Sequence, residues 1–236
     1  MDNQNKIITF RYKFIFDDGT EKKFTVELVR NTLELIKKEK GLPPQWTELK
    51  NFRCPHCPLD VKFHTYCPVA VTLVDLVESF RESISYNEVD LLIETDDRSY
   101  IKHTSLQHGI SSLAGIYMVT SGCPIMEKLK PMVRFHLPFA TVFETEYRVI
   151  SMYLLAQYFL YKKGINPDWD MKNLVKIYND VKIVNLNFCR KLADIKIKDA
   201  TLNALAKLDF FAENVNLMLN KGKLDEIELL FKPFFM

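Results

Sequence analysis

The chain has 236 residues, which is enough for one or two domains with a sizeable hydrophobic core. Apolar residues make up 47% and charged residues 26%, and 32 basic residues against 30 acidic ones leave a formal net charge of +2. This balance gives no indication of nucleic acid or a membrane as a partner, and no apolar stretch is long enough to cross a bilayer. The first residues lack a basic segment followed by an apolar one, so we expect no signal peptide and a cytoplasmic location.

The first part of the chain predicts a β-hairpin followed by a short helix. Residues 7–16 and 23–29 are rich in β-branched and aromatic side chains, and the sequence DDGT between them is typical of a tight turn. Residues 33–40 are expected to form the helix, which Gly41 would end. Residues 42–70 then contain five prolines and three cysteines, so we interpret them as a long loop tied down by a functional group.

A helix, a second hairpin and another helix are expected next. Apolar residues with helical spacing cover residues 71–84. Residues 88–95 and 99–103 predict two strands around the turn sequence DDR. Thr104 with Gln107 matches a capping box, which would open a helix that continues through Ser121 and ends at Gly122.

The second half of the chain is predicted to be helical. Thr141 with Glu144 is another capping-box match, and it heads a helix that we expect to reach about residue 163. Because this helix is apolar nearly all round, we expect it to be buried centrally. Further helices are expected at residues 169–194, 200–220 and 224–232.

Together these patterns predict the α+β class. N-terminal β-hairpins with a cysteine-rich loop would pack on a largely helical C-terminal half. The expected organisation is a β-containing region of residues 1–124 and a helical region of residues 125–236, either as separate units or around one shared core.

The cysteines carry the strongest functional signal, because four of the five are followed directly by proline: Cys54, Cys57, Cys67 and Cys123. At an average proline usage of about 5%, chance would give this roughly a few times in 10^5. Proline restricts the preceding residue to extended backbone, so we expect these cysteines to lie outside helices. Four thiols are the number that one tetrahedral metal ion or one iron–sulfur cluster requires. Cys189 lacks the proline, lies in a predicted helix and is interpreted as an ordinary buried thiol.

The prolines also bear on which metal group the four cysteines would bind. Each proline lacks an N–H group, and Pro58 stands where zinc loops commonly carry glycine. With fewer N–H donors the thiolates would be more electron-rich, which favours a 4Fe–4S cluster slightly over zinc. The alternative is that the cysteines are small buried hydrophobic residues without a metal. His56 and His64 lie in the same loop and are candidates to replace one cysteine, or else they are solvated loop residues.

The sequence Cys54-Pro55-His56-Cys57 resembles the active-site tetrad of DsbA-type thiol–disulfide oxidoreductases. That resemblance implies Cys54 as the nucleophile and Cys57 as the resolving thiol. It covers four residues only, and neither a βαβ pattern nor a helical period accompanies it.

Weaker candidates for catalysis lie between the two halves of the chain. His136, Arg134 and Glu144 could serve acid–base chemistry or substrate binding near a metal. The structural alternative is a hydrogen-bonded core histidine, with Glu144 closing the capping box and Arg148 pairing with it. Motifs of phosphate-binding loops, serine hydrolases and zinc proteases are absent from the sequence.

The segments CPHCPLD, CPVA, SGCPIMEKLKPMVRFHLPF and YLLAQYF resemble those of an uncharacterised family of bacterial hypothetical proteins, over about residues 10–230. This resemblance implies a bacterial cytosolic protein and no particular activity.

Two functional hypotheses follow. One is an iron–sulfur redox or enzyme component, with Cys54, Cys57, Cys67 and Cys123 as ligands. The other is a zinc-stapled adaptor that binds a protein partner, or a second copy of itself, without catalysis.

Overall fold

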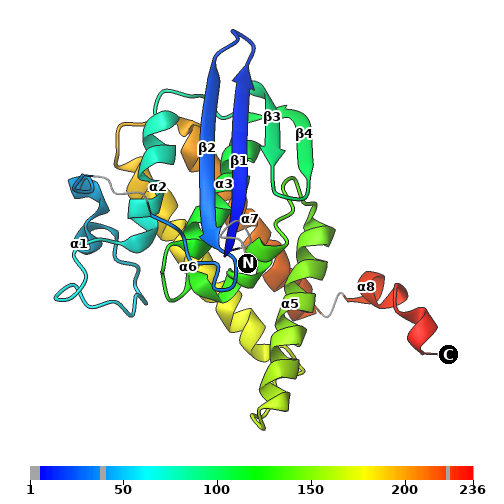
Figure 1. Cartoon of the computed structure of the whole chain (residues 1–236). Coiled ribbons are helices and arrows are strands. Elements are labelled where there is room, and N and C mark those ends of the chain that lie inside the picture. Colours follow the sequence, from blue (N-terminus) through cyan, green and yellow to red (C-terminus); the bar gives the residue numbers. More distant parts are fainter. Residues whose placement is uncertain (1–5, 38–40, 222–223, 236) are drawn as a thin grey trace.

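The protein is described by a computed structural model over residues 6–37, 41–221 and 224–235. A sheet of four antiparallel strands in the order β2-β1-β3-β4 lies against a layer of helices (Figure 1). The strands are β1 (Ile7–Phe16), β2 (Glu21–Val29), β3 (Glu88–Glu94) and β4 (Ser99–Ser105). Both predicted hairpins are present, and the α+β class is confirmed.

The helices follow the predicted order. The longer ones are α2 (Pro68–Ser79), α3 (Leu106–Thr120), α5 (Val142–Lys162), α6 (Lys172–Ala193) and α7 (Asp199–Lys221). The shorter ones are α1 (Leu49–Phe52), α4 (Pro131–Arg134), α8 (Asp225–Leu229) and the 3-10 helices η2 (Gln45–Thr47), η3 (Met126–Leu129) and η4 (Lys232–Phe234). The expected terminal helix is thus divided into α8 and η4.

The sheet packs on the helices through β1 and β3. Alternate residues of β1 are buried: Ile8, Phe10, Tyr12 and Phe14. Successive strand side chains point to opposite faces, so these four share one face of the sheet. Helix α3 approaches this face at Gly109, where a Cβ atom would lie 2.5 Å from Cε1 of Phe14 and 2.7 Å from Cδ2 of Leu91. Only glycine fits this approach without displacing a neighbour.

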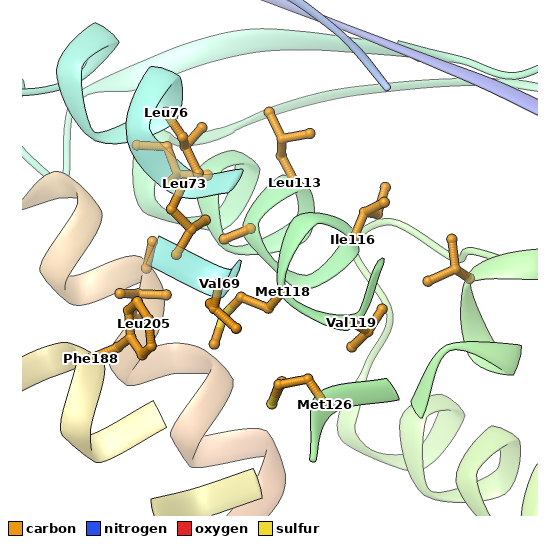
Figure 2. Packing of buried hydrophobic residues seen from close by; sticks show 14 of the residues in the cluster. Val69, Leu73, Leu76, Leu113, Ile116, Met118, Val119, Met126, Phe188 and Leu205 are labelled. Atoms are coloured by element: carbon orange, nitrogen blue, oxygen red, sulfur yellow. The ribbon is translucent and has the colours of Figure 1, made fainter. Parts of the chain in front are cut away.

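One cluster of buried side chains extends from β1 to α7. Figure 2 shows its centre, where Leu73 of α2, Met118 of α3, Phe188 of α6 and Leu205 of α7 come together. Helix α7 contacts both α3 and α6. The cluster therefore contains residues from both halves of the chain.

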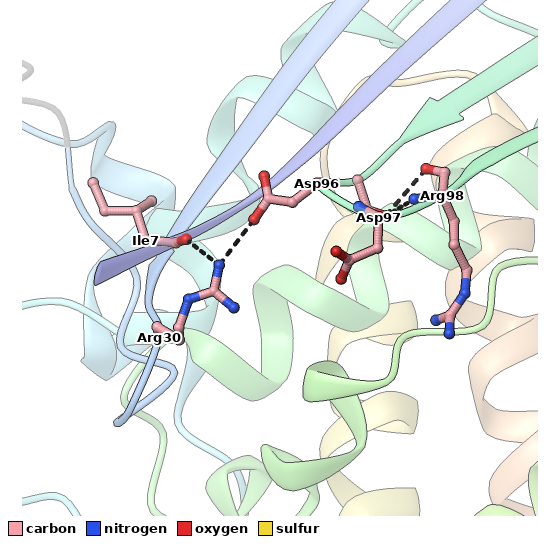
Figure 3. Close-up of polar contacts among 6 residues, drawn as sticks. Ile7, Arg30, Asp96, Asp97 and Arg98 are labelled. Atoms are coloured by element: carbon pink, nitrogen blue, oxygen red, sulfur yellow. Dashed lines mark hydrogen bonds and ion pairs between the residues drawn. The ribbon is translucent and has the colours of Figure 1, made fainter. Parts of the chain in front are cut away.

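Arg30 joins the two hairpins at one end of the sheet (Figure 3). Its Nη2 atom donates to the backbone oxygen of Ile7 at 3.1 Å and to Oδ2 of Asp96 at 3.2 Å. The contact links the end of the first hairpin to the turn of the second.

The helix expected at residues 33–40 is a wrong prediction over the part that the structure describes. Leu33 has a positive φ of 56°, and Leu35 forms an isolated antiparallel bridge with Leu28. The segment thus returns along β2, which is an edge strand of the sheet. The free backbone groups of this edge form the hydrogen bonds that the segment would otherwise make within a short helix. Residues 38–40 lie outside the described residues.

The capping box expected at Thr104 is also wrong. Thr104 is still part of β4, and α3 begins after Ser105, which makes no side-chain capping hydrogen bond. The Oγ1 atom of Thr104 lies 3.0 Å from Nδ1 of His108 instead. The end of the helix agrees with the prediction, because Gly122 has a positive φ of 91°.

Helix α5 is not buried centrally as expected. It lies at the side of the molecule (Figure 1), and its buried residues are Val149, Ile150, Tyr153 and Gln157. Its exposed apolar side chains are Phe143, Tyr147, Leu155, Tyr158, Phe159 and Tyr161. Apolar residues on all sides allow a helix to be buried, but they do not decide which of its faces other elements cover. Within the described residues, no helix is long and apolar enough to cross a membrane.

The close approach at Gly109 gives a stability prediction. We expect Gly109→Ala to lower the free energy of unfolding by about 1–3 kcal/mol, because the methyl group would overpack against Phe14 and Leu91. Chemical denaturation measures the change.

Gly115 on the same helix is the matched control, because its added Cβ would meet only Cδ2 of Leu208 at an ordinary 3.7 Å. Gly115→Ala should raise the free energy of unfolding by up to about 1 kcal/mol through helix propensity. Equal effects of the two substitutions would contradict the close approach.

Candidate functional site

The four Cys-Pro cysteines come from three separate segments. Cys54 follows α1 and forms a turn with Cys57, whose N–H donates to the Cys54 carbonyl at 3.0 Å. Cys67 is the N-cap of α2, and Cys123 lies between α3 and η3. As expected from the prolines, none of these four residues is inside a helix. Cys54, Cys67 and Cys123 are buried, and Cys57 is half-buried.

The four thiols affect one another electrostatically. Burial, followed by the charges of Cys67, Cys123 and Cys57, raises the pKa of Cys54 to about 12. Burial likewise raises the pKa of Cys67 to about 11, with contributions from Cys123 and Cys57. Burial followed by the charge of Cys57 raises the pKa of Cys123. The charge of Cys123 thus contributes to the electrostatic surroundings of Cys54 and Cys67 in the cysteine-rich loop.

The spacing of these thiols is wider than that of a formed single-ion site. Within the described residues, no three or more His, Cys, Asp or Glu side chains are grouped so that they could hold a metal ion. The cysteines thus form a neighbourhood of thiols, in which ligation would require the sulfur atoms to converge.

Backbone N–H groups face two of the cysteines. Those of Ala70 and Val69 lower the pKa of Cys67 against the effect of burial, and those of Met126 and Ile125 do the same for Cys123. In α2 the proline occupies the first helical position. Proline suits this position, because its missing N–H group has no helical partner there.

This geometry corrects the expectation that the prolines deprive the thiolates of N–H donors. The proline removes only the first N–H group after the cysteine, and the next two remain free at the start of the helical turn. For Cys67 and Cys123, a scarcity of donors therefore no longer favours a cluster over zinc.

The cysteine-rich loop is held by ordinary hydrogen bonds as well. The N–H of Cys67 donates to the Thr47 carbonyl at 2.8 Å, and the N–H of Leu49 donates to the Thr65 carbonyl at 2.8 Å. Asn187 of α6 donates to the Phe52 carbonyl at 3.0 Å. A hydrogen bond between the Asn187 side chain and Cys54 lowers the pKa of that thiol against the effect of burial. The two ends of the loop are thus fixed by protein contacts.

The two histidines of this loop differ. His64 is exposed. Nε2 of His56 lies 3.1 Å from the backbone oxygen of Asp180, while its Nδ1 atom is buried and has no hydrogen-bond partner among the described residues. A carbonyl that accepts from Nε2 leaves the lone pair on Nδ1, as is common for metal-ligating histidines. His56 therefore has the tautomer that a ligand needs.

The DsbA-type interpretation does not fit the structure. Burial raises the pKa of Cys54, whereas the nucleophile of such enzymes has a lowered pKa at a helix N-terminus. Cys54 precedes a turn instead of a helix, and the sheet is entirely antiparallel.

His136 is a hydrogen-bonded interior residue. Its Nε2 atom lies 2.7 Å from the hydroxyl of Tyr12 and 3.2 Å from that of Ser112, and these hydroxyls are 2.9 Å apart. Burial, followed by the charge of Arg148, lowers the pKa of His136 to about 3. The ring is therefore neutral at physiological pH, as in the structural alternative.

Arg134 and Glu144 do not join His136 in a common site. Glu144 completes the predicted capping box with Thr141, whose N–H it accepts at 2.7 Å. The guanidinium of Arg134 lies over the Phe135 ring, 5.7 Å from its centroid. Arg148 donates to the backbone oxygens of Met132 and Phe135 at 2.9 and 3.0 Å, instead of pairing with Glu144.

The family model described as "Domain of unknown function (DUF6901)" matches residues 10–232. The chain matches no curated protein. It also matches no solved structure.

The lowered pKa of His136 predicts an acid-sensitive fold. Between about pH 6.5 and 3 the unfolded chain binds a proton at this residue that the folded chain does not, so stability falls as the pH falls. One such proton contributes a slope of at most about 1.4 kcal/mol per pH unit. Urea denaturation at several pH values should show a shallower slope for His136→Gln than for the unmodified protein.

His103→Gln is the control for this experiment. His103 is exposed, and its hydrogen bond to the Asp90 carboxylate raises its pKa, which is the opposite direction. Its replacement should not flatten the slope. A His136→Gln slope equal to that of the unmodified protein would contradict the assignment.

Proposed function

The chain belongs to a family described as a domain of unknown function, and we propose that it is a cytoplasmic metal-binding protein that holds a 4Fe–4S cluster. The proposed ligands are Cys54, Cys57, Cys67 and Cys123. The observation that carries this proposal is that Cys54, Cys67 and Cys123, from three separate segments, are all buried, and that the charges of the other three thiols contribute to the raised pKa of Cys54.

The chemistry of the donor set supports the proposal. Thiolates select soft metal groups, such as zinc, copper(I) and iron–sulfur clusters. The raised pKa values of Cys54 and Cys67 keep both thiols neutral without a metal, so binding would release protons and strengthen as the pH rises. All five cysteines are free thiols, as a reducing cytoplasm would keep them.

The surroundings of the cysteines support a redox role. Hydrogen bonds to cluster sulfurs adjust the reduction potential, and backbone N–H groups face Cys67 and Cys123. Residues 60–65 are exposed beside the cysteines. A redox partner could approach the cluster from this side of the loop.

A zinc-stapled adaptor is the second candidate. It is favoured by the exposed aromatic face of α5, which continues at the C-terminus, where the rings of Tyr147 and Phe231 stack at 6.4 Å. Exposed apolar patches of this kind mark protein interaction sites. In this case the metal would fix the loop to the end of α3, and α5 would bind a protein partner or a second copy of the chain.

Metal analysis of anaerobically purified protein tests both candidates. The first predicts about four iron and four sulfide per chain and a visible absorption that dithionite bleaches. The second predicts about one zinc per colourless chain, and unfolding on chelation. Absence of iron, sulfide and zinc would contradict both.

Substitution of single cysteines identifies the ligands. We expect Cys54→Ser and Cys123→Ser to lose most of the bound metal, because each removes one of four thiolates. Cys189→Ser should keep it, since this half-buried cysteine of α6 lacks the proline and lies outside the thiol neighbourhood. Equal metal content in all three variants would contradict the assignment.

A further inference from the structure

A cavity of about 470 Å³ lies between α3, α6, α7 and the covering segment 126–148. Its volume is in the range of small-molecule binding sites. The proposed metal ligands do not line it. It therefore offers a second place where this protein could bind a ligand.

Most of the cavity wall is apolar. Helix α3 contributes Ile116 and Val119, the covering segment contributes Val133, and α7 contributes Leu208 and Ala212. A wall of this kind favours a ligand with an apolar body, because each area of apolar surface removed from water stabilises the complex.

Basic side chains gather at one part of the wall. Lys102 of β4, His108 of α3 and Lys207 of α7 all line the cavity. Burial, followed by the charges of Lys207 and Lys102, lowers the pKa of His108, and burial followed by the charge of Lys102 lowers the pKa of Lys207. Arg148 also lines the cavity, and no Asp or Glu side chain in the described part of the chain does.

The two lysines contact aromatic rings that line the same cavity. Nζ of Lys102 lies 5.4 Å from the centroid of Phe139, and Nζ of Lys207 lies 5.5 Å from that of Phe211. Neither lysine forms an ion pair with a described residue. Two neighbouring ammonium groups without a carboxylate repel each other, and an anion between them would remove that cost.

The interior also contains a polar group that the fold does not satisfy. Asn185 of α6 lines the cavity and is 2% exposed, and its Oδ1 atom has no hydrogen-bond partner within the described residues. An unpaired buried polar atom costs about 1–3 kcal/mol. A polar atom of a bound molecule would recover part of this cost.

From this combination we propose that the cavity binds a monocarboxylate with an apolar body, of the size of a medium-chain fatty acid. Its carboxylate lies between Lys102 and Lys207, and its body lies among the apolar side chains of α3 and α7. Charge complementarity selects the anionic head, and the apolar wall selects the chain. The proposal is independent of the metal group, because the cavity and the thiols share no ligating residue.

The test is calorimetric titration of the full-length protein, as isolated, with decanoate and with decanol as the neutral analogue. We expect decanoate to bind about tenfold or more tightly than decanol, because hydrogen bonds to charged groups are the stronger ones. Equal binding of the two, or no binding of decanoate, would overturn the proposal.

The variant Lys102→Gln/Lys207→Gln tests the residues. It should weaken decanoate binding about tenfold or more and leave decanol binding unchanged. Lys172→Gln/Lys176→Gln makes the same change in net charge on exposed positions of α6 outside the cavity, and it should leave both affinities unchanged. Equal weakening by both double variants would overturn the assignment, because it would show a response to net charge alone.

A cavity-filling variant gives a separate check. Gly115→Leu places a side chain in the cavity from α3, where the first added carbon meets Leu208 at an ordinary distance. It should abolish decanoate binding while the protein keeps its circular dichroism spectrum. A folded Gly115→Leu protein that still binds decanoate would overturn the location of the site.

Discussion

The position of α3 is the constraint on which the rest of the structure depends. At Gly109 the helix lies so close to the sheet that a residue with a Cβ atom would not fit, so β1 and β3 fix where the helix lies. Ser112 is then beside Tyr12 and His136, and the helix ends at Gly122, directly before Cys123. The same helix contributes one wall of the cavity.

The Cys-Pro pairs have a local structural reason as well as a proposed chemical one. At α2 the cysteine is the N-cap and the proline occupies the first helical position, so the free N–H groups of the first turn face the sulfur. A similar arrangement precedes η3, where N–H groups lower the pKa of Cys123. The proposed metal site and the proposed ligand cavity adjoin at Met126. Its backbone N–H group faces Cys123, and Met126 also lines the cavity.

Several features could not be obtained from the sequence. The hydrogen bonds of His136 join residues 24 and 124 positions apart, and the cavity collects single residues from elements between β4 and α7. The polarity of each residue gives no indication of such pairs. The apolar composition of α5 predicts central burial. A helix at the side of the molecule can have the same composition when other elements cover only one of its faces, as they do here.

The sequence alone determined the elements that depend on local patterns. These are the two hairpins, the capping box at Thr141, the end of α3 at Gly122 and the position of the four Cys-Pro cysteines outside helices. They follow from turn residues, capping pairs and the restriction that proline places on its neighbour, which act over a few residues. Only the tertiary structure decided that His136 lies against Tyr12 and Ser112 and that Lys102 and Lys207 line one apolar cavity. Both depend on how α3 packs between the sheet and α7, and that packing is set by contacts between residues far apart in the chain.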